Sequence, residues 1–105
     1  MINSKRKGKM GELNLVKKLK EYGYNCVRTE QYNGKAEDSE ADLRGLQGIH
    51  IEVKNREKHN IYDYIEQVKR DKNDNEIGTV FIKSNNKEWL CLLTLDDFMR
   101  LYKGV

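Results

Sequence analysis

The segment 49–54 constrains the fold more strongly than any other part of the sequence, because apolar and polar residues alternate along it without interruption. Isoleucine and valine occupy one side of the extended chain, and His50, Glu52 and Lys54 occupy the other. This period-two alternation is typical of a β-strand with one face in a core. The sequence therefore predicts a strand over residues 49–55 that presents a carboxylate beside an amine.

A second carboxylate, Asp42, lies ten residues before Glu52. If residues 41–46 form a strand and Gln47-Gly48 turns the chain, a hairpin brings Asp42 back beside Glu52 and Lys54. Neighbouring carboxylates favour a cation, and Mg²⁺ binds through carboxylates, waters and substrate phosphates. A lysine beside them can orient a water or stabilise charge on a phosphate. The pattern suits metal-assisted hydrolysis of a phosphodiester, although by spacing alone a solvated Glu–Lys pair on an edge strand is the simpler interpretation.

Three further polar residues could belong to the same site, and each has a simpler alternative. Glu12 lies at the edge of an apolar helical stripe, where a carboxylate needs a partner or a metal, or else it only interacts with the helix dipole. Ser39 belongs to a polar segment, residues 30–40, that leads into the second carboxylate, or it is an ordinary loop serine. Gln67 lies at the margin of another helical stripe, where it reaches the metal site or a DNA phosphate, or is a surface glutamine.

The rest of the sequence alternates between helical and strand patterns. Residues 1–8 form a basic segment that we expect to be a flexible arm, and residues 9–105 are expected to form a single domain. Asn60 is a suitable N-cap for the second helix, and Thr94 with Asp97 resembles a capping pair for the last. From the apolar periodicities we expect helices over 9–22, 61–72 and 96–103, and strands over 24–29, 77–84 and 88–95, with the strand over 24–29 central.

Composition limits the classes of protein to which the chain can belong. A chain of 105 residues can build one modest core. Its net charge of +3 permits a nucleic-acid partner without requiring one. No apolar run follows the basic start and no stretch approaches the length of a membrane span, so we expect neither a signal peptide nor a membrane partner. Cys26 and Cys91 fit no metal spacing and are expected to be reduced core residues. We expect Phe98, Leu101 and Tyr102 to dock the last helix.

Several short motifs follow one another within residues 5–55. They are, in chain order, Arg6-Lys7-Gly8 followed by Glu12, Leu15-Val16-Lys17-Lys18-Leu19, Tyr22-Gly23-Tyr24, Val27-Arg28, Asp42-Leu43 and Ile51-Glu52-Val53-Lys54. Together with the order of the predicted elements, these motifs resemble the PD-(D/E)XK nuclease superfamily and, within it, the archaeal-type Holliday junction resolvases and their phage relatives. The resemblance covers residues 5–55 closely and the remainder by the order of its elements. Ala41 stands in place of the proline that names the superfamily, which leaves Asp42 unaffected.

The resemblance implies an α/β fold, the PD-(D/E)XK nuclease core, in which a central mixed β-sheet is flanked by α-helices. It implies that Glu12, Asp42 and Glu52 ligate or orient the metal and that Lys54 positions or activates the attacking water. Ser39 would lie near the scissile phosphate. The implied DNA contacts come from Lys5, Arg6, Lys7, Lys9, Arg28 and Gln67.

These implications lead to a functional hypothesis. We expect a Mg²⁺-dependent endodeoxyribonuclease, in which Mn²⁺ can substitute, that resolves four-way (Holliday) DNA junctions by paired symmetric cuts and needs no small-molecule cofactor. A symmetric junction favours a homodimer, and we expect it to act in the cytoplasm, that of a host if the chain is phage-encoded. Three alternatives stay open: a flap, nicking or restriction-type nuclease on the same fold, a non-catalytic DNA-binding module on the same scaffold, and a domain that binds protein partners through its charged surface.

Overall fold

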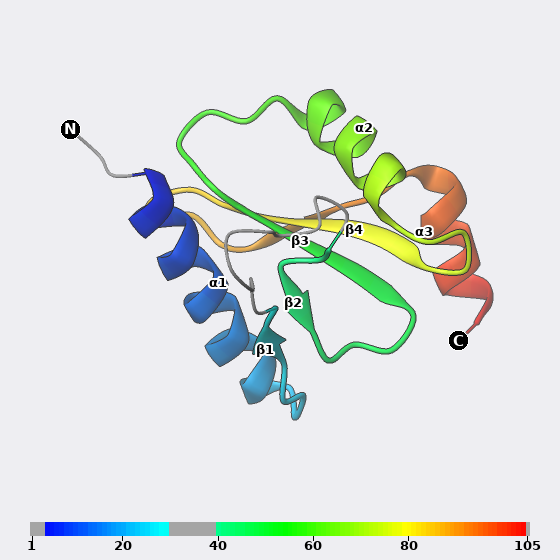
Figure 1. Cartoon of the computed structure of the whole chain (residues 1–105), viewed down its shortest axis with the longest axis horizontal. Helices are drawn as coiled ribbons and strands as arrows, with labels where there is room; N and C mark the ends of the chain where they lie inside the picture. The colour runs from blue at the N-terminus through cyan, green and yellow to red at the C-terminus, as the bar shows by residue number, and fades with distance from the viewer. Residues whose placement is uncertain (1–3, 30–39, 105) are drawn as a thin grey trace.

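A five-stranded mixed β-sheet forms the centre of the molecule in the computed structural model, which describes residues 4–29 and 40–104 (Figure 1). The elements are α1 (Ser4–Glu21), β1 (Val27–Arg28), β2 (Leu43–Arg44), β3 (Ile49–Asn55), α2 (Ile61–Asp71), β4 (Ile77–Lys83), β5 (Leu90–Leu92) and α3 (Leu95–Lys103). The strands lie side by side in chain order. β3 and β4 are parallel and joined by α2, whereas the other neighbouring strands are antiparallel.

Helices cover both faces of this sheet. α1 packs on one face, where Leu15 joins a core cluster with Ile51 and Phe81. α2 packs on the opposite face, where Tyr64 joins a second cluster with Val80. Burying one such large apolar side chain contributes roughly 1.5–3 kcal/mol, so the sheet is stabilised from both sides.

β3 is buried on both faces, which differs from the expectation of one solvated face. His50 and Glu52, on its polar side, are only 2 % and 4 % exposed. The cause is the parallel crossover from β3 to β4. The connecting helix α2 packs over the side of the sheet that carries Glu52 and so covers the polar face of β3. The expectation that residues 24–29 form the central strand is also wrong, since β1 is a two-residue strand at the edge of the sheet.

α1 begins at Ser4, so the basic segment that we expected to be a flexible arm is helical from that residue onward. Contacts with the end of β3 hold this turn. Asn55 donates a hydrogen bond from Nδ2 to the carbonyl of Lys7 (3.1 Å), and Lys7 Nζ lies 3.4 Å from Glu57. Gly11 permits the approach, because a Cβ there would lie 2.6 Å from the Cβ of Asn55. Contacts between distant residues, rather than apolar periodicity, therefore order the first helical turns.

The predicted caps of α2 and α3 are confirmed. The side chain of Asn60 accepts a hydrogen bond from the backbone N–H of Asp63 (3.3 Å), and that of Thr94 accepts one from the N–H of Asp97 (3.1 Å). Each bond satisfies a backbone donor that the first turn of a helix leaves without an intrahelical partner. The starts of both helices are thus fixed by local sequence.

A buried carboxylate attaches α3 to the sheet. Asp97 Oδ2 accepts a hydrogen bond from the backbone N–H of Gly78 in β4 (3.0 Å), and Asp97 Oδ1 accepts one from Arg100 (3.0 Å). The expected docking of α3 by apolar side chains is wrong, because those residues remain between 44 % and 64 % exposed. They are Phe98, Leu101 and Tyr102. A polar contact between α3 and β4 therefore replaces the apolar contact that the sequence suggested.

The remaining expectations on composition are met in part. Cys26 is free and buried, as expected, whereas Cys91 is free and exposed. Trp89 packs against the core cluster on the α1 face. In the described part of the chain, no helix is both long enough and apolar enough to cross a bilayer.

Candidate active site

The predicted hairpin brings Asp42 to the polar side of β3. Gly48 adopts the positive φ of 81° that its turn requires. The backbone N–H of Asp42 donates to the carbonyl of Ile51 (2.8 Å), and Asp42 Oδ2 accepts a hydrogen bond from the N–H of Val53 (2.8 Å). These two bonds fix both the backbone and the carboxylate of Asp42 next to Glu52.

Asp42 and the buried Glu52 form a carboxylate pair in which each charge disfavours the other. Burial raises the pKa of Asp42 to about 7, and the charge and hydrogen bond of Glu52 and the charge of Glu12 act in the same direction. The N–H of Val53 acts in the opposite direction. Buried carboxylates in this situation gain from a cation, and their oxygens are donors that Mg²⁺ prefers. The pair therefore fits a divalent metal.

His50 holds the other side of Glu52. Its Nε2 lies 2.9 Å from Glu52 Oε1, and its Nδ1 lies 3.8 Å from Glu76 Oε1. Burial lowers the pKa of His50, but the hydrogen bond and charge of Glu52, together with the charges of Glu76 and Asp71, outweigh burial and raise it. One oxygen of Glu52 thus has a fixed partner on its own strand.

The third predicted carboxylate, Glu12, lies near the pair but has a partner of its own. It projects from α1, and Arg28 donates a hydrogen bond from Nε to Glu12 Oε1 (2.8 Å). Its charge still contributes to the raised pKa of Asp42. Across the described residues, no three acidic, histidine or cysteine side chains are arranged to hold an ion together. The structure brings two of the three predicted ligands together and leaves the third close by in an ion pair.

Lys54 follows on the same face of β3, and its ammonium lies over the ring of Tyr64. The distance from Lys54 Nζ to the ring centroid is 5.3 Å, and the guanidinium of Arg56 lies 5.7 Å from the same centroid. Tyr64 is only 4 % exposed, so the ring is a fixed support. Such cation–π contacts contribute about 0.5–2 kcal/mol. The ring therefore holds the ammonium on the α2 side of the strand.

An open pocket of about 440 Å³ begins at Lys54. Gln67 of α2 lines this pocket, so it lies on the same side of the sheet as Lys54. Asp42 and Glu52 are not part of the lining. The predicted residues thus fall into two adjoining parts, a buried acidic part and an open basic part.

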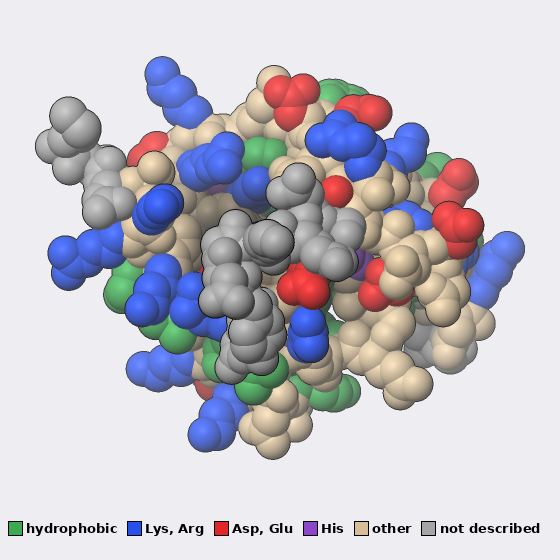
Figure 2. All heavy atoms as spheres, in the orientation of Figure 1, with side chains coloured by type: hydrophobic (Ala, Val, Ile, Leu, Met, Phe, Trp, Pro, Cys, Tyr) green, Lys and Arg blue, Asp and Glu red, His purple; other side chains and the backbone are tan. Residues whose placement is uncertain are grey.

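The remaining predicted DNA contacts lie mainly on α1. Lys7 is bonded to Glu57, and Arg28 comes from β1. Lysine and arginine side chains gather on the face that α1 occupies (Figure 2). Ser39 lies outside the described residues. The exposed basic residues in the first turns of α1 are Lys5, Arg6 and Lys9.

Two members of the site were not recognised from the sequence, His50 as a partner of Glu52 and Arg56 as a continuation of the polar row. Positions 50, 52, 54 and 56 share a face, because the N–H of Arg56 still donates to the carbonyl of Lys83 (3.0 Å) and so prolongs the ladder. The alternation that predicted the strand already puts His50 on the face of Glu52, and extending it by one more position of that face identifies Arg56.

The sequence matches a family model over most of its length. The model of the archaeal Holliday junction resolvases (Hjc) matches residues 3–97. The chain belongs to this family. A solved structure, that of Archaeoglobus fulgidus Hjc, a Holliday junction resolvase from an archaeal hyperthermophile, has a TM-score of 0.62 and 22 % sequence identity, and the match covers 82 % of this chain and 76 % of that one. No curated protein matches the chain.

Family membership confirms the predicted resemblance, and the structural likeness confirms the α/β fold with its mixed sheet. The chain is a Holliday junction resolvase, that is, a nuclease whose substrate is branched DNA. Nucleases of this family require a divalent metal, which agrees with the carboxylate pair beside Lys54.

Proposed function

We propose that this resolvase hydrolyses junction phosphodiesters beside the Asp42–Glu52 pair, with Mg²⁺ as its metal and Lys54 as the neighbouring cation. The supporting observation is that the N–H of Val53 (2.8 Å) fixes the carboxylate of Asp42 beside the buried Glu52, and burial together with Glu52 raises the pKa of Asp42 to about 7. Two carboxylates that lie close together in a largely buried place disfavour each other's charge, so a bound cation stabilises them. Hard oxygen donors beside an ammonium group are the chemistry that phosphodiester hydrolysis needs.

Asp42 and Glu52 would hold the ion, and Mn²⁺ would substitute because it accepts the same oxygen donors. When bound, the ion supplies positive charge to the phosphate and acidity to a water. Glu12 remains the proposed third ligand or orienting group, and Arg28 keeps its carboxylate in place. Hydrogen bonding from His50 keeps Glu52 oriented.

Lys54 lies two residues after Glu52 on the same face, and the ring of Tyr64 restricts its ammonium. In this position it donates hydrogen bonds to a phosphate oxygen, stabilises the charge that builds up around phosphorus, and orients the attacking water. Ser39 is proposed to contact the scissile phosphate.

The basic side chains would position the DNA without reading its bases. Lys5, Arg6, Lys7 and Lys9 lie in the first turns of α1, where they can contact backbone phosphates. Two symmetric cuts require two sites, so we propose a homodimer that contributes one site from each subunit. The proposed compartment of action is the cytoplasm.

Incubation of the purified protein with an end-labelled four-way junction tests this function. With Mg²⁺ we expect nicks at symmetric positions in two opposing strands, and with EDTA we expect none. Binding without cleavage in either Mg²⁺ or Mn²⁺ would favour a non-catalytic module. Equal rates on a junction, a flap and a plain duplex would contradict selectivity for junctions.

A further inference from the structure

Beyond Lys54, the polar row of β3 continues as a cluster of cations. Arg56 points to the same side as Lys54, because its N–H prolongs the ladder to Lys83 (3.0 Å). Lys58 follows in the connector to α2. All three cations line the open pocket of about 440 Å³, and the lining sets one carboxylate against them, that of Asp63.

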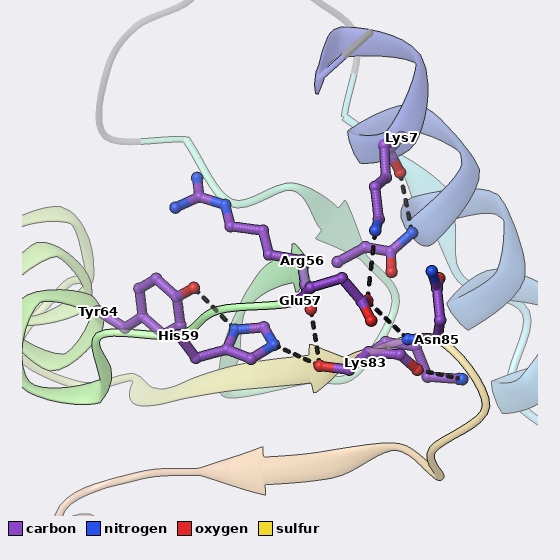
Figure 3. A network of polar contacts seen from close by, with 9 residues as sticks. Lys7, Arg56, Glu57, His59, Tyr64, Lys83 and Asn85 are labelled. Atoms are coloured by element: carbon purple, nitrogen blue, oxygen red, sulfur yellow. Dashed lines mark hydrogen bonds and ion pairs between the residues drawn. The ribbon is translucent and has the colours of Figure 1, made fainter. Parts of the chain in front are cut away.

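Among the described residues, no carboxylate is paired with these cations. Within residues 4–29 and 40–104, none of the three forms an ion pair with a carboxylate. The adjacent Glu57 is turned away, because it bonds Lys7 Nζ (3.4 Å) and the N–H of Asn85 (2.8 Å) (Figure 3). Lys54 and Arg56 instead share the ring of Tyr64. Two like charges over one ring repel each other, so the cluster gains from a bound anion.

A chain of hydrogen bonds fixes the wall of the pocket (Figure 3). Ser84 donates its single hydroxyl proton to the carbonyl of Arg56 (2.7 Å), so it accepts a hydrogen bond from Nε2–H of His59 (2.9 Å). The other ring nitrogen, Nδ1, lies 2.8 Å from the hydroxyl of Tyr64, within hydrogen-bond distance. The connector after β3 is thereby tied to β4 and α2 before any ligand binds.

We propose that this pocket binds the phosphodiester that neighbours the scissile one on the same DNA strand. Arg56 and Lys58 are its charged contacts, and the amide of Gln67 is a further donor. The proposal rests on the proposed function and adds a second phosphate site to it. Lys54 and Arg56 lie two positions apart on one face and over the same ring, so the pocket directly adjoins the cation proposed for the scissile phosphate. A preformed second contact positions the scissile bond over the acidic pair.

An NMR titration of the ¹⁵N-labelled protein with hexathymidylate tests the pocket without any need for cleavage. We expect the backbone amide signals of residues 56–60 and the side-chain amide of Gln67 to shift, and these shifts to disappear in the Arg56→Gln, Lys58→Gln double variant. Lys103→Gln, which removes an exposed charge at the end of α3, is the matched control and should keep the shifts. An unchanged spectrum elsewhere shows that the fold is intact. Absence of shifts over residues 56–60 in the wild type overturns the proposal.

Junction binding in EDTA gives the second measurement. The slope of log K against log salt should fall by about 0.9 for each lost phosphate contact, so by nearly 2 in the double variant. Lys103→Gln should keep the wild-type slope. If the wild type cuts junctions but the double variant keeps its slope, the pocket is refuted and the resolvase function stands. If hexathymidylate shifts the pocket signals but no junction is cut, the proposed function is refuted and the pocket stands.

Discussion

The two halves of the polar face of β3 are built in opposite ways. The half around Asp42 and Glu52 is largely buried, and its carboxylates lie against each other and His50. The half that runs from Lys54 to Lys58 is open, and its cations lie over an aromatic ring or in solvent. The acidic half gains from a cation and the basic half gains from an anion. A phosphodiester bound together with a divalent metal places the metal against the acidic half and its own negative charge against the basic half, so this division fits the proposed substrate.

The largest expected effect comes from removing charge from the acidic half. Glu52→Gln keeps the size of the side chain, but cleavage should fall by more than about 1000-fold, beyond the loss that follows removal of one stabilising donor. Junction binding should persist, because the basic contacts remain. Single-turnover cleavage and gel-shift titration measure the two properties, and Glu88→Gln, an exposed carboxylate before β5, is the control. Parallel loss of binding and cleavage would contradict the role assigned to Glu52.

A second test asks whether the acidic half is destabilised without metal. The pKa of Asp42 in the fold, about 7, exceeds the ordinary value of 3.8, so the unfolded chain releases this proton first. The stability of the wild type should therefore fall, relative to Asp42→Asn, as pH rises from about 4 to about 7. At about pH 8 the variant should be more stable by up to roughly 4 kcal/mol, because each unit of pKa difference corresponds to about 1.4 kcal/mol. Urea unfolding without divalent ions measures this difference.

Added Mg²⁺ should remove the stability difference between the wild type and Asp42→Asn, because an ion that binds only the folded wild type stabilises it by mass action. Identical pH profiles for the wild type and Asp42→Asn would show that the pair carries no uncompensated charge, and would remove the contrast between the two halves.

Local signals in the sequence predicted much of the fold. The alternation over residues 49–54, the turn at Gly48 and the caps at Asn60 and Thr94 each depend on residues a few positions apart, and each is confirmed. The failures involve partners distant in sequence. Asp97 anchors α3 through a bond to Gly78, and the first turn of α1 is held by contacts from the end of β3, neither of which periodicity can reveal.

The candidate site divides in the same way. Hairpin geometry and period-two spacing predicted that Asp42, Glu52 and Lys54 lie together. The structure places Asp42 beside Glu52 and puts Lys54 on the same face of β3, with its ammonium over Tyr64. The alternation could not show that a helix covers their side of the sheet, and burial is what makes the acidic pair electrostatically unfavourable. The hydrogen-bond chain through His59 joins three elements, so no single stretch of sequence carries a signal for it.

Replacing the Tyr64 ring beneath Lys54, at the boundary between the two halves, should have a smaller effect on cleavage. Tyr64→Leu removes the ring and should slow single-turnover cleavage at saturating DNA by about tenfold, in keeping with the loss of a partly desolvated cation–π contact. Tyr64→Phe keeps the ring and should cleave at nearly the wild-type rate, while losing about 1 kcal/mol of stability with its hydrogen bond to His59. An equal loss of rate in both variants would assign the positioning to the hydroxyl network rather than to the ring.

The smallest effect concerns Arg28, which could belong to either half. Its Nε is bonded to Glu12, so its terminal nitrogens can still reach a phosphate. The pair is partly exposed, so Arg28→Gln should change stability by about 1 kcal/mol or less. If Arg28 also contacts DNA, the salt slope of junction binding should fall by about 0.9 in Arg28→Gln and stay unchanged in Glu12→Gln. An unchanged slope in both would make Arg28 a partner of Glu12 alone, and the acidic half would then extend from β3 across to α1.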